Sequence, residues 1–183
     1  RKEYHAQVDN LIAELRKHIT VNSDLKVKKV VKAGSFAKFT ILKKTAEDDI
    51  DVDVVFYIDG KNIDNTTLDN LNDLIYSLLT KIYPTKAVED FEIQRRAATV
   101  TFVKSGISVD IVPVIQDELD PNHGWQYDLK SKERNLTCAP CHIQFIQDRK
   151  NSDKHYRTLV RMAKRWKNFA CPPGLKSFHL ELI

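Results

Sequence analysis

The sequence predicts a mixed α/β (α+β) fold with a helical continuation, and three observations support this. Apolar residues recur every three or four positions in 4–19, 66–83 and 153–169, which is the period of an amphipathic helix. Between these segments lie short runs rich in β-branched residues, as expected for strands: 26–33, 51–58, 97–103 and 107–114. The order is one helix, a strand-rich middle with a second helix, and a helical end, which is typical of a sheet with helices packed on it.

The first helix is predicted by a single apolar stripe: Val8, Leu11, Ile12, Leu15 and Ile19. The strand 26–33 then stops at Gly34-Ser35, where a tight loop is expected, and the strand 51–58 is closed by Asp59-Gly60. Pro84 ends the second helix.

The strands 97–103 and 107–114 are expected to form a hairpin around Lys104-Ser105-Gly106. Residues 116–137 are polar and contain Pro121 and Gly124, so a loop is expected there.

Helices are expected to resume over 142–148 and 153–169. Pro172-Pro173-Gly174 breaks the helical pattern, and Leu175 restarts it.

The chain has 183 residues, of which 42% are hydrophobic and 30% charged, so it suits one folded domain with an appendage. Its longest unbroken apolar run, 54–58, is far below the ~20 residues that cross a bilayer, and no secretory signal is visible. Three cysteines, an odd number, favour a reducing compartment over a disulfide framework. We therefore expect a cytoplasmic protein with no membrane partner.

The net charge is only +4, but its distribution is uneven. Residues 26–44 contain seven lysines and no acid, and an acidic cluster follows at 47–53. A second basic stretch, 149–167, contains a single acid, Asp153. Such runs are usually solvated faces, and a nucleic-acid surface is the alternative.

Three acids form the candidate chemical site. Asp51 and Asp53 stand two residues apart on a strand, so both project from one face, roughly 6–7 Å apart at their Cα atoms. Asp110 lies in an otherwise apolar strand, where a carboxylate needs a partner. Carboxylates gathered in this way suit a pair of divalent cations, and Mg²⁺ typically brings phosphates. Gly34-Ser35 supports this interpretation, because small residues at a strand end let backbone N–H groups approach a phosphate.

Alternatives stay open for each acid. Asp51 and Asp53 would also suit a solvated cluster at a strand start. Asp110 would also suit an ion pair with Arg95 or Arg96, or a position at the edge of the sheet. Asp49-Ile50-Asp51 competes as the acid pair. We prefer Asp51 with Asp53 because the apolar run follows directly.

Four blocks of sequence resemble the DNA polymerase β-like nucleotidyltransferase superfamily. Three match its signatures: Gly34-Ser35-Phe36-Ala37-Lys38-Phe39-Thr40, Asp51-Val52-Asp53-Val54-Val55-Phe56 and Val109-Asp110-Ile111-Val112-Pro113. The fourth, 159–166 followed by 175–182, is similar to helical segments of 2′-5′-oligoadenylate synthetases and cyclic GMP-AMP synthase. The bacterial CD-NTases, which make cyclic oligonucleotide signals in anti-phage defence, resemble residues 33–183 most.

The resemblance implies a role for each matching residue. The implied metal ligands, which would hold two Mg²⁺ ions or Mn²⁺ in their place, are Asp51, Asp53 and Asp110. The implied nucleotide-binding residues are Gly34 and Ser35 for the donor triphosphate, Lys164 and Ser177 for its β and γ phosphates, and Phe178 for stacking on a base. Asp110 would also draw the proton from the acceptor hydroxyl. Two departures stand out: the loop after Thr40 looks longer than in the animal enzymes, and Phe39 stands where relatives commonly have glycine.

The implied function is a pyrophosphate-releasing nucleotidyltransferase that joins NTPs, ATP above all, into a cyclic second messenger of CBASS type. The implied activator is a protein or a nucleic acid. One alternative is a linear 2′-5′-oligoadenylate synthetase-like or RNA-tailing enzyme, and another is a catalytically silent nucleic-acid-binding domain. The implied organisation is an N-terminal helix over 1–20, a catalytic core over 21–137 and the start of a helical lobe over 138–183, cut short.

Cys138-Ala139-Pro140-Cys141-His142 suggests zinc, because thiolates and an imidazole at this spacing can form a tetrahedral site. His155 and Cys171 downstream are isolated and do not supply a second tight ligand pair. The sequence therefore favours a loop with two incidental thiols, and whether Cys138, Cys141 and His142 bind zinc stays open.

Overall fold

The computed structural model describes residues 2–42, 50–60 and 65–182. The strands in this part of the chain are β1 (Val27–Lys32), β2 (Ile50–Ile58), β3 (Phe91–Ile93), β4 (Ala98–Phe102), β5 (Ile107–Gln116), β6 (Gly124–Asp128) and β7 (Glu133–Thr137). The helices are α1 (Lys2–Asn22), α2 (Gly34–Lys38), α3 (Asn65–Ile82), α4 (Ala139–Ser152) and α5 (Tyr156–Ala170), with 3₁₀ turns η1 (Val88–Asp90) and η2 (His179–Glu181). None of the described helices combines the length and the apolar composition that a bilayer crossing requires.

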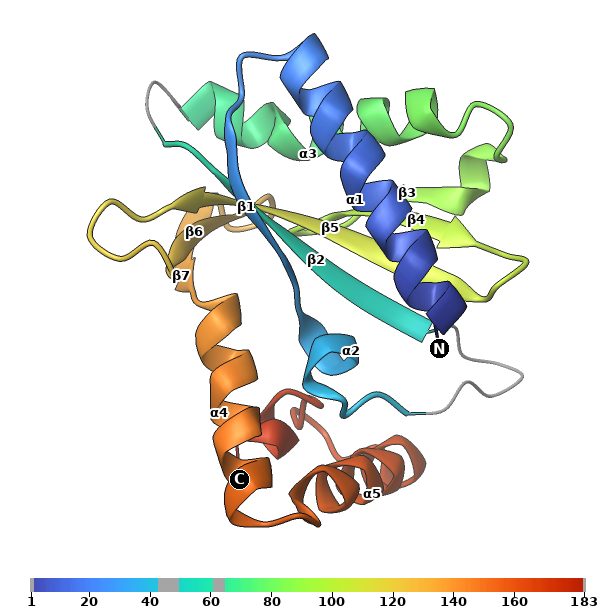
Figure 1. Cartoon of the computed structure of the whole chain (residues 1–183), viewed down its shortest axis with the longest axis vertical. Helices are drawn as coiled ribbons and strands as arrows, with labels where there is room; N and C mark the ends of the chain where they lie inside the picture. The colour runs from blue at the N-terminus through green and yellow to red at the C-terminus, as the bar shows by residue number, and fades with distance from the viewer. Residues whose placement is uncertain (1, 43–49, 61–64, 183) are drawn as a thin grey trace.

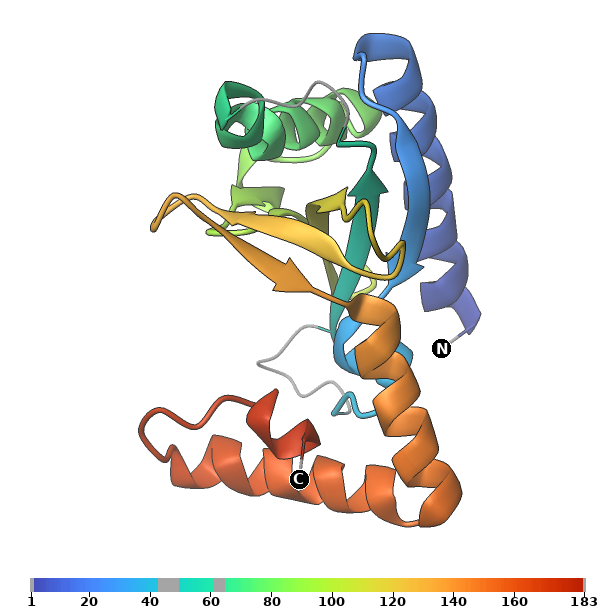
Figure 2. The same cartoon turned by 90° about the vertical axis from the view of Figure 1, so that its left-hand side faces the viewer.

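All the described strands join one mixed sheet in the order β1-β2-β5-β4-β3, and β6 connects β5 to β7. The mixed α/β fold expected from the sequence is confirmed. Figures 1 and 2 show α4 leaving the sheet at the end of β7 and α5 lying beyond α2, away from the sheet. The sheet and this helical segment therefore face each other across the region of α2.

The central strands β2 and β5 run parallel and in register, with Asp53 opposite Asp110. Val52, Val54 and Phe56 are fully buried in the core that α1 and α3 form on one face of the sheet. Because side chains alternate along a strand, Asp51 and Asp53, which alternate with these residues, project from the opposite face. The periodicity that buries the valines therefore places the acids on the face that the N-terminal helices leave open.

The helices on the covered face are those that the periodic stripes predict. Leu11 and Leu15 of α1 and Ile75 and Leu78 of α3 are fully buried against the sheet. Each buried aliphatic side chain of this kind contributes about 1.5–3 kcal/mol, so the stripe determines how each helix packs.

The prediction of a loop over 116–137 is wrong, because most of this segment forms the β6–β7 hairpin. Main-chain pairing with the end of β5 supports β6, and Trp125 and Tyr127 pack against Ile58 and Ile115. This stabilisation comes from residues distant in sequence, so the polar composition of the segment does not show it.

Two further segments differ from expectation. The tight loop expected at Gly34-Ser35 is the short helix α2, which begins at Gly34 with a positive φ of 60°. The prediction that a helix restarts at Leu175 is wrong. The described chain there forms turns, and its one helical element is the 3₁₀ turn η2. The segment between Gly174 and η2 is too short to nucleate an α-helix.

The cysteine prediction also needs correction. Cys138 and Cys141 form a disulfide, and they lie at the N-terminus of α4 rather than in a loop. Cys138 caps the helix with its sulfur, which accepts a hydrogen bond from the Cys141 N–H at 3.1 Å. The helix therefore begins three residues earlier than the expected 142.

Candidate active site

A cleft of about 840 Å³ lies between the open face of the sheet and the helical segment. It brings together all eight residues that the sequence singled out: Gly34, Ser35, Asp51, Asp53, Asp110, Lys164, Ser177 and Phe178. The first five come from the sheet and α2, and the last three from α5 and the turn that leads into η2. The competing acid, Asp49, lies outside the described residues.

The carboxylates gather because β2 and β5 are neighbours. Asp53 and Asp110 are direct partners in the parallel register, and Asp51 lies two residues before Asp53 on the same face. Thr99, opposite Asp110 on β4, donates its hydroxyl to Asp110 Oδ1 at 2.6 Å. Thr99 therefore fixes the orientation of one carboxyl group in the cleft.

Burial and mutual repulsion make it costly to ionise these acids together. Burial and then the charge of Asp110 raise the pKa of Asp53 to about 6; Lys38 opposes this in part, and the charge of Asp51 adds a smaller increase. Burial also raises the pKa of Asp110, and the Thr99 hydrogen bond offsets part of this. An oxygen-rich set that is destabilised by its own charge is what a divalent cation would stabilise, so these residues fit a divalent-metal site.

The ion-pair alternative for Asp110 is wrong. Arg95 and Arg96 direct their Nε atoms to the two carboxylate oxygens of Asp128, at 2.6 Å and 2.8 Å. Asp128 is fully buried on β6. Both arginines thus bind the hairpin, and the hydrogen-bond partner of Asp110 is Thr99.

Gly34 lies directly against Asp53. A Cβ atom built on Gly34 would overlap with Asp53 Oδ2, and its φ of +60° disfavours other residues as well. The N–H of the preceding residue, Ala33, donates to the Asp53 carbonyl at 2.7 Å. The turn into α2 is therefore hydrogen-bonded to β2, the strand that carries Asp51 and Asp53.

The helical side of the cleft is held by Glu181, a buried acid of η2. Its carboxylate pairs with the ammonium groups of Lys38 and Lys164 and accepts the Thr40 hydroxyl at 2.6 Å. Burial disfavours the charged carboxylate, but the hydrogen bonds from Lys164, Lys38 and Thr40 outweigh it and lower the pKa of Glu181. Lys164 thus lines the cleft with its ammonium group held by Glu181.

Phe178 presents its ring on this side of the cleft. It is 40% exposed, with the His142 ring 5.1 Å away and the Lys38 ammonium 5.5 Å from its centroid. A partly exposed aromatic face beside an ammonium group can stack on a nucleobase.

Comparison with known proteins identifies the family. The profile of the Second Messenger Oligonucleotide or Dinucleotide Synthetase domain, SMODS, matches residues 2–151. The chain belongs to the SMODS family. Over 184 aligned residues, this SMODS chain is 54% identical to the CBASS oligonucleotide cyclase CdnC of Escherichia coli strain KTE188, covering 100% of itself and 58% of that protein.

Two solved structures of E. coli MS115-1 CdnC are also similar. The structure with ATP has a TM-score of 0.76 at 30% identity, over 99% of this SMODS chain and 57% of that one. The complex with HORMA-deltaN has a TM-score of 0.75 at 31% identity, over 99% and 56%. The resemblance to bacterial CD-NTases is thus confirmed, and the chain spans less than two thirds of the length of these relatives.

Sequence reasoning missed several residues of this SMODS cleft. They are Lys38, Arg96, Thr99, His142 and Glu181; four line the cleft, and Thr99 contacts it through Asp110. Lys38 and Glu181 do stand inside the quoted motif blocks, where their charge was a usable signal. Their pairing was not visible, because 143 positions separate them.

Proposed function

We propose that this chain carries the nucleotidyltransferase centre of a cyclic oligonucleotide synthase in CBASS-type anti-phage signalling. The observation that carries this proposal is one cleft that is lined by three carboxylates, the Gly34-Ser35 turn, a lysine and an aromatic ring. The SMODS family and the 54% identity to an oligonucleotide cyclase support the cyclic product.

In the proposed reaction, a ribose hydroxyl of the acceptor attacks the α-phosphorus of the donor NTP. A P–O bond forms to the ribose, the bond to the β-phosphate oxygen breaks, and pyrophosphate leaves. Two Mg²⁺ ions held by Asp51, Asp53 and Asp110 would supply positive charge that stabilises the reacting phosphate and the leaving group. Asp110, oriented by the Thr99 hydroxyl, accepts the proton of the acceptor hydroxyl.

The donor triphosphate is bound from both sides of the cleft. The N–H groups at Gly34 and Ser35 and the Ser35 hydroxyl contact it from α2, where the absence of a side chain at Gly34 lets the phosphates approach. Lys164 and Ser177 contact the β and γ phosphates from the helical side, and Phe178 stacks on the base. Glu181 keeps Lys38 and Lys164 together near this position.

We propose ATP as a substrate and a HORMA-type protein as a partner. The structures of E. coli MS115-1 CdnC with ATP and with HORMA-deltaN support both choices. These proteins are longer than the present chain, so the proposal concerns a protein of their length.

A nucleic-acid-binding role is less well supported. In the basic segment 26–44, Lys28, Lys32 and Lys38 pair with the carboxylates of Asp59, Asp9 and Glu181. Paired lysines contribute less to the binding of a polyanion than free ones do. Lys43 and Lys44 lie outside the described residues.

Two experiments test the metal and nucleotide site and the identity of the product separately. Titration of this chain with Mn²⁺ and ATP should show metal-dependent nucleotide binding, which Asp51→Asn and Asp53→Asn abolish; binding unchanged in both variants contradicts the site. A protein of the relatives' length, given labelled ATP and Mg²⁺, should form a phosphatase-resistant product. A phosphatase-sensitive product would identify the linear oligoadenylate or RNA-tailing alternative instead.

A further inference from the structure

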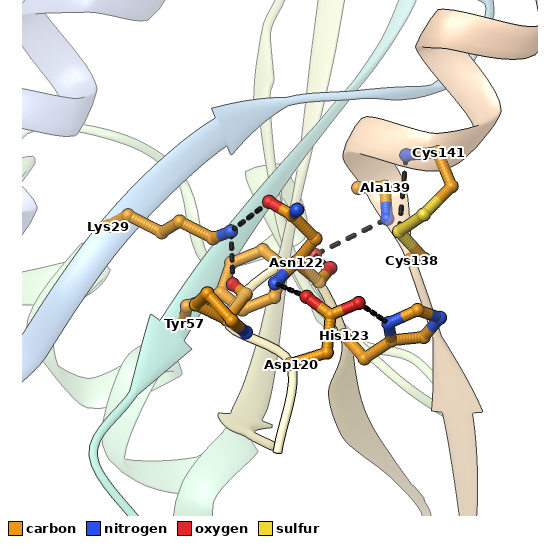
Figure 3. Close-up of a disulfide and its surroundings, with 9 residues drawn as sticks. Lys29, Tyr57, Asp120, Asn122, His123, Cys138, Ala139 and Cys141 are labelled. Carbon is orange, nitrogen blue, oxygen red and sulfur yellow. Dashed lines mark hydrogen bonds and ion pairs between the residues drawn. A yellow bond between two sulfur atoms is a disulfide. The ribbon is translucent and has the colours of Figure 1, made fainter. Parts of the chain in front are cut away.

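A second group of potential metal ligands lies outside the acidic cleft. His123, Cys138 and Cys141 each offer one ligand atom, and the three atoms lie within 4.8 Å of one another. His123 belongs to the loop between β5 and β6, whereas the cysteines flank the start of α4 (Figure 3). The nearby His142, which the sequence suggested as the third ligand, instead lies against Phe178 in the cleft.

The imidazole of His123 is held in a defined orientation. Its Nδ1 lies 2.8 Å from Asp120 Oδ2, and the other carboxylate oxygen of Asp120 accepts the Asn122 N–H at 2.8 Å. A carboxylate at Nδ1 fixes the tautomer that carries a proton there, which leaves the Nε2 lone pair for a metal. Carboxylate–histidine pairs of this kind commonly support zinc sites.

The cysteines have the spacing and the environment of metal ligands. Cys138 is buried and Cys141 is exposed, two residues separate them, and the Cys141 N–H donates to the Cys138 sulfur. A helix N-terminus and an N–H donor stabilise the thiolate over the thiol. A Cys-x-x-Cys pair is the tightest ligand pair of most structural zinc sites.

We propose that His123, Cys138 and Cys141 bind one Zn²⁺ ion when the disulfide is reduced, with water at the fourth position. A thiol or phosphine reductant gives two electrons to the S–S bond, the bond breaks, and each sulfur takes one proton. Zn²⁺ then replaces both thiol protons, which pass to solvent. Disulfide and zinc site are alternative states of the same two sulfurs.

The position of this site connects it to the cleft. Between the two cysteines, the Ala139 N–H donates to the Tyr57 hydroxyl at 3.3 Å, and that hydroxyl donates to the Asn122 carbonyl at 3.0 Å (Figure 3). Zn²⁺ would add a direct link between the His123 loop and the first turn of α4, the helix that carries His142 into the cleft. The metal would thus fix the angle at which the helical segment leaves the sheet.

The test measures metal binding to the whole chain rather than activity. After reduction with a phosphine and removal of the reductant without air, the wild-type chain should bind about one Zn²⁺ more than the oxidised chain, and Co²⁺ in its place should give sulfur-to-cobalt charge-transfer absorption. Cys138→Ser, Cys141→Ser and His123→Gln should each lose most of this binding. Asp120→Asn should weaken it by about tenfold or more, because it no longer orients the imidazole as strongly.

Two variants serve as matched controls. Cys171→Ser removes the exposed free cysteine, and His142→Gln removes the neighbouring imidazole, so both should retain the metal. If a cysteine variant fails to fold, oxidised and reduced wild-type protein are compared, and only the reduced form should show the additional Zn²⁺ ion and the cobalt–thiolate absorption. Reduced, folded protein with neither the additional zinc nor cobalt–thiolate absorption overturns the proposal, as does equal binding by His123→Gln and wild type.

Discussion

Gly34 contacts Asp53 so closely that the presence of Asp53 leaves no room for a side chain at position 34. The positive φ of Gly34 and the overlap that a Cβ would make with Asp53 Oδ2 both disfavour any side chain at this position. A carboxylate whose pKa is raised by burial and by neighbouring charges is thus packed against the backbone that we expect to contact phosphate.

We predict that Gly34→Ala destabilises the chain and weakens Mn²⁺ binding. Left-handed backbone alone costs a non-glycine residue about 1–2 kcal/mol, and displacement of Asp53 adds to this. Gly174→Ala is the matched control, because Gly174 has a φ of +73° but open space around its Cβ position. Urea unfolding and Mn²⁺ titration of both variants measure the difference, and equal losses in both would contradict the contact with Asp53.

We predict that, above about pH 6, Asp53→Asn raises the melting temperature of the metal-free chain and abolishes its stabilisation by Mg²⁺. The pKa of Asp53, about 6 in the fold, exceeds its ordinary 3.8, so the fold holds a proton that the unfolded chain releases. The associated stability is complete below about pH 4 and is lost as the pH rises through about 6. Mg²⁺ should therefore stabilise wild type more at pH 8 than at pH 5.

The control for this experiment is Asp24→Asn, which changes an exposed acid outside the cleft. It should leave both the melting temperature and the Mg²⁺ effect unchanged. A metal-dependent shift that persists in Asp53→Asn would contradict its assignment as a ligand.

At the scale of elements, Glu181 links three parts of the molecule that meet at the cleft. Lys38 belongs to α2, Lys164 to α5 and Glu181 to η2. Because all three side chains are almost fully buried, the carboxylate neutralises two ammonium groups that would otherwise be desolvated without a counter-charge.

We therefore predict that Glu181→Gln destabilises the chain by about 3 kcal/mol or more. The amide retains the shape of the carboxylate but not its charge, so the loss reports on the ion pairs rather than on a cavity. Glu133→Gln, at an exposed position on β7, is the control and should change stability by no more than about 0.5 kcal/mol. Denaturant unfolding of both variants checks this, and a loss as small as the control's would show that Glu181 is dispensable.

The β6–β7 hairpin depends on Asp128 in a comparable way. Hydrogen bonds from Arg95 and Arg96 and from the Ser131 and Lys130 N–H groups hold the pKa of Asp128 below its usual range, against the effect of burial. A lowered pKa contributes stability that is present above the unfolded value of about 3.9 and is lost as the pH falls through the folded value.

We predict that Asp128→Asn lowers the melting temperature at pH 7 and that this difference shrinks below about pH 4. Melting curves of variant and wild type across this range check the prediction. A difference that is independent of pH would mean that shape, not charge, accounts for the role of Asp128.

The elements that could be predicted from the sequence are those whose signal is local. The stripe in α1 and the Asp51-Val52-Asp53 alternation in β2 each repeat within a few residues, and both are confirmed as elements. The β6 strand could not be predicted, because its stability comes from β5 and from Ile58 and Ile115. Phe39, noted as a departure from relatives, adopts a φ of 60°, which explains why glycine suits that position.

In the candidate site, too, some features could be predicted from the sequence and others could not. The acids stand in short motifs that can be read in sequence, whereas the contact of Thr99 with Asp110 and the ion pairs of Glu181 depend on register and on distant elements. The eight residues implied by the resemblance line one cleft, but their roles stay predictions until binding is measured.

At the scale of the whole molecule, α5 has one buried face and one exposed apolar face. Val160 and Lys164 are buried, whereas Met162, Trp166 and Phe169 are 64%, 55% and 91% exposed. The relatives are longer than this chain, which spans 58% of the CdnC protein. We propose that polypeptide corresponding to the rest of their length packs on this face and completes a helical lobe that begins at residue 138.

We predict that Trp166→Gln changes the stability of this chain by no more than about 0.5 kcal/mol, because an exposed side chain contributes little. In a protein of the relatives' length, the same change should cost about 2 kcal/mol or more, since burying an apolar side chain contributes roughly that amount. Val160→Ala is the control and should cost roughly 1.5 kcal/mol in both lengths, because Val160 is buried already in this chain. Denaturant unfolding of the four variants compares the two faces, and an equally small effect of Trp166→Gln in both lengths would show that the exposed face of α5 stays uncovered.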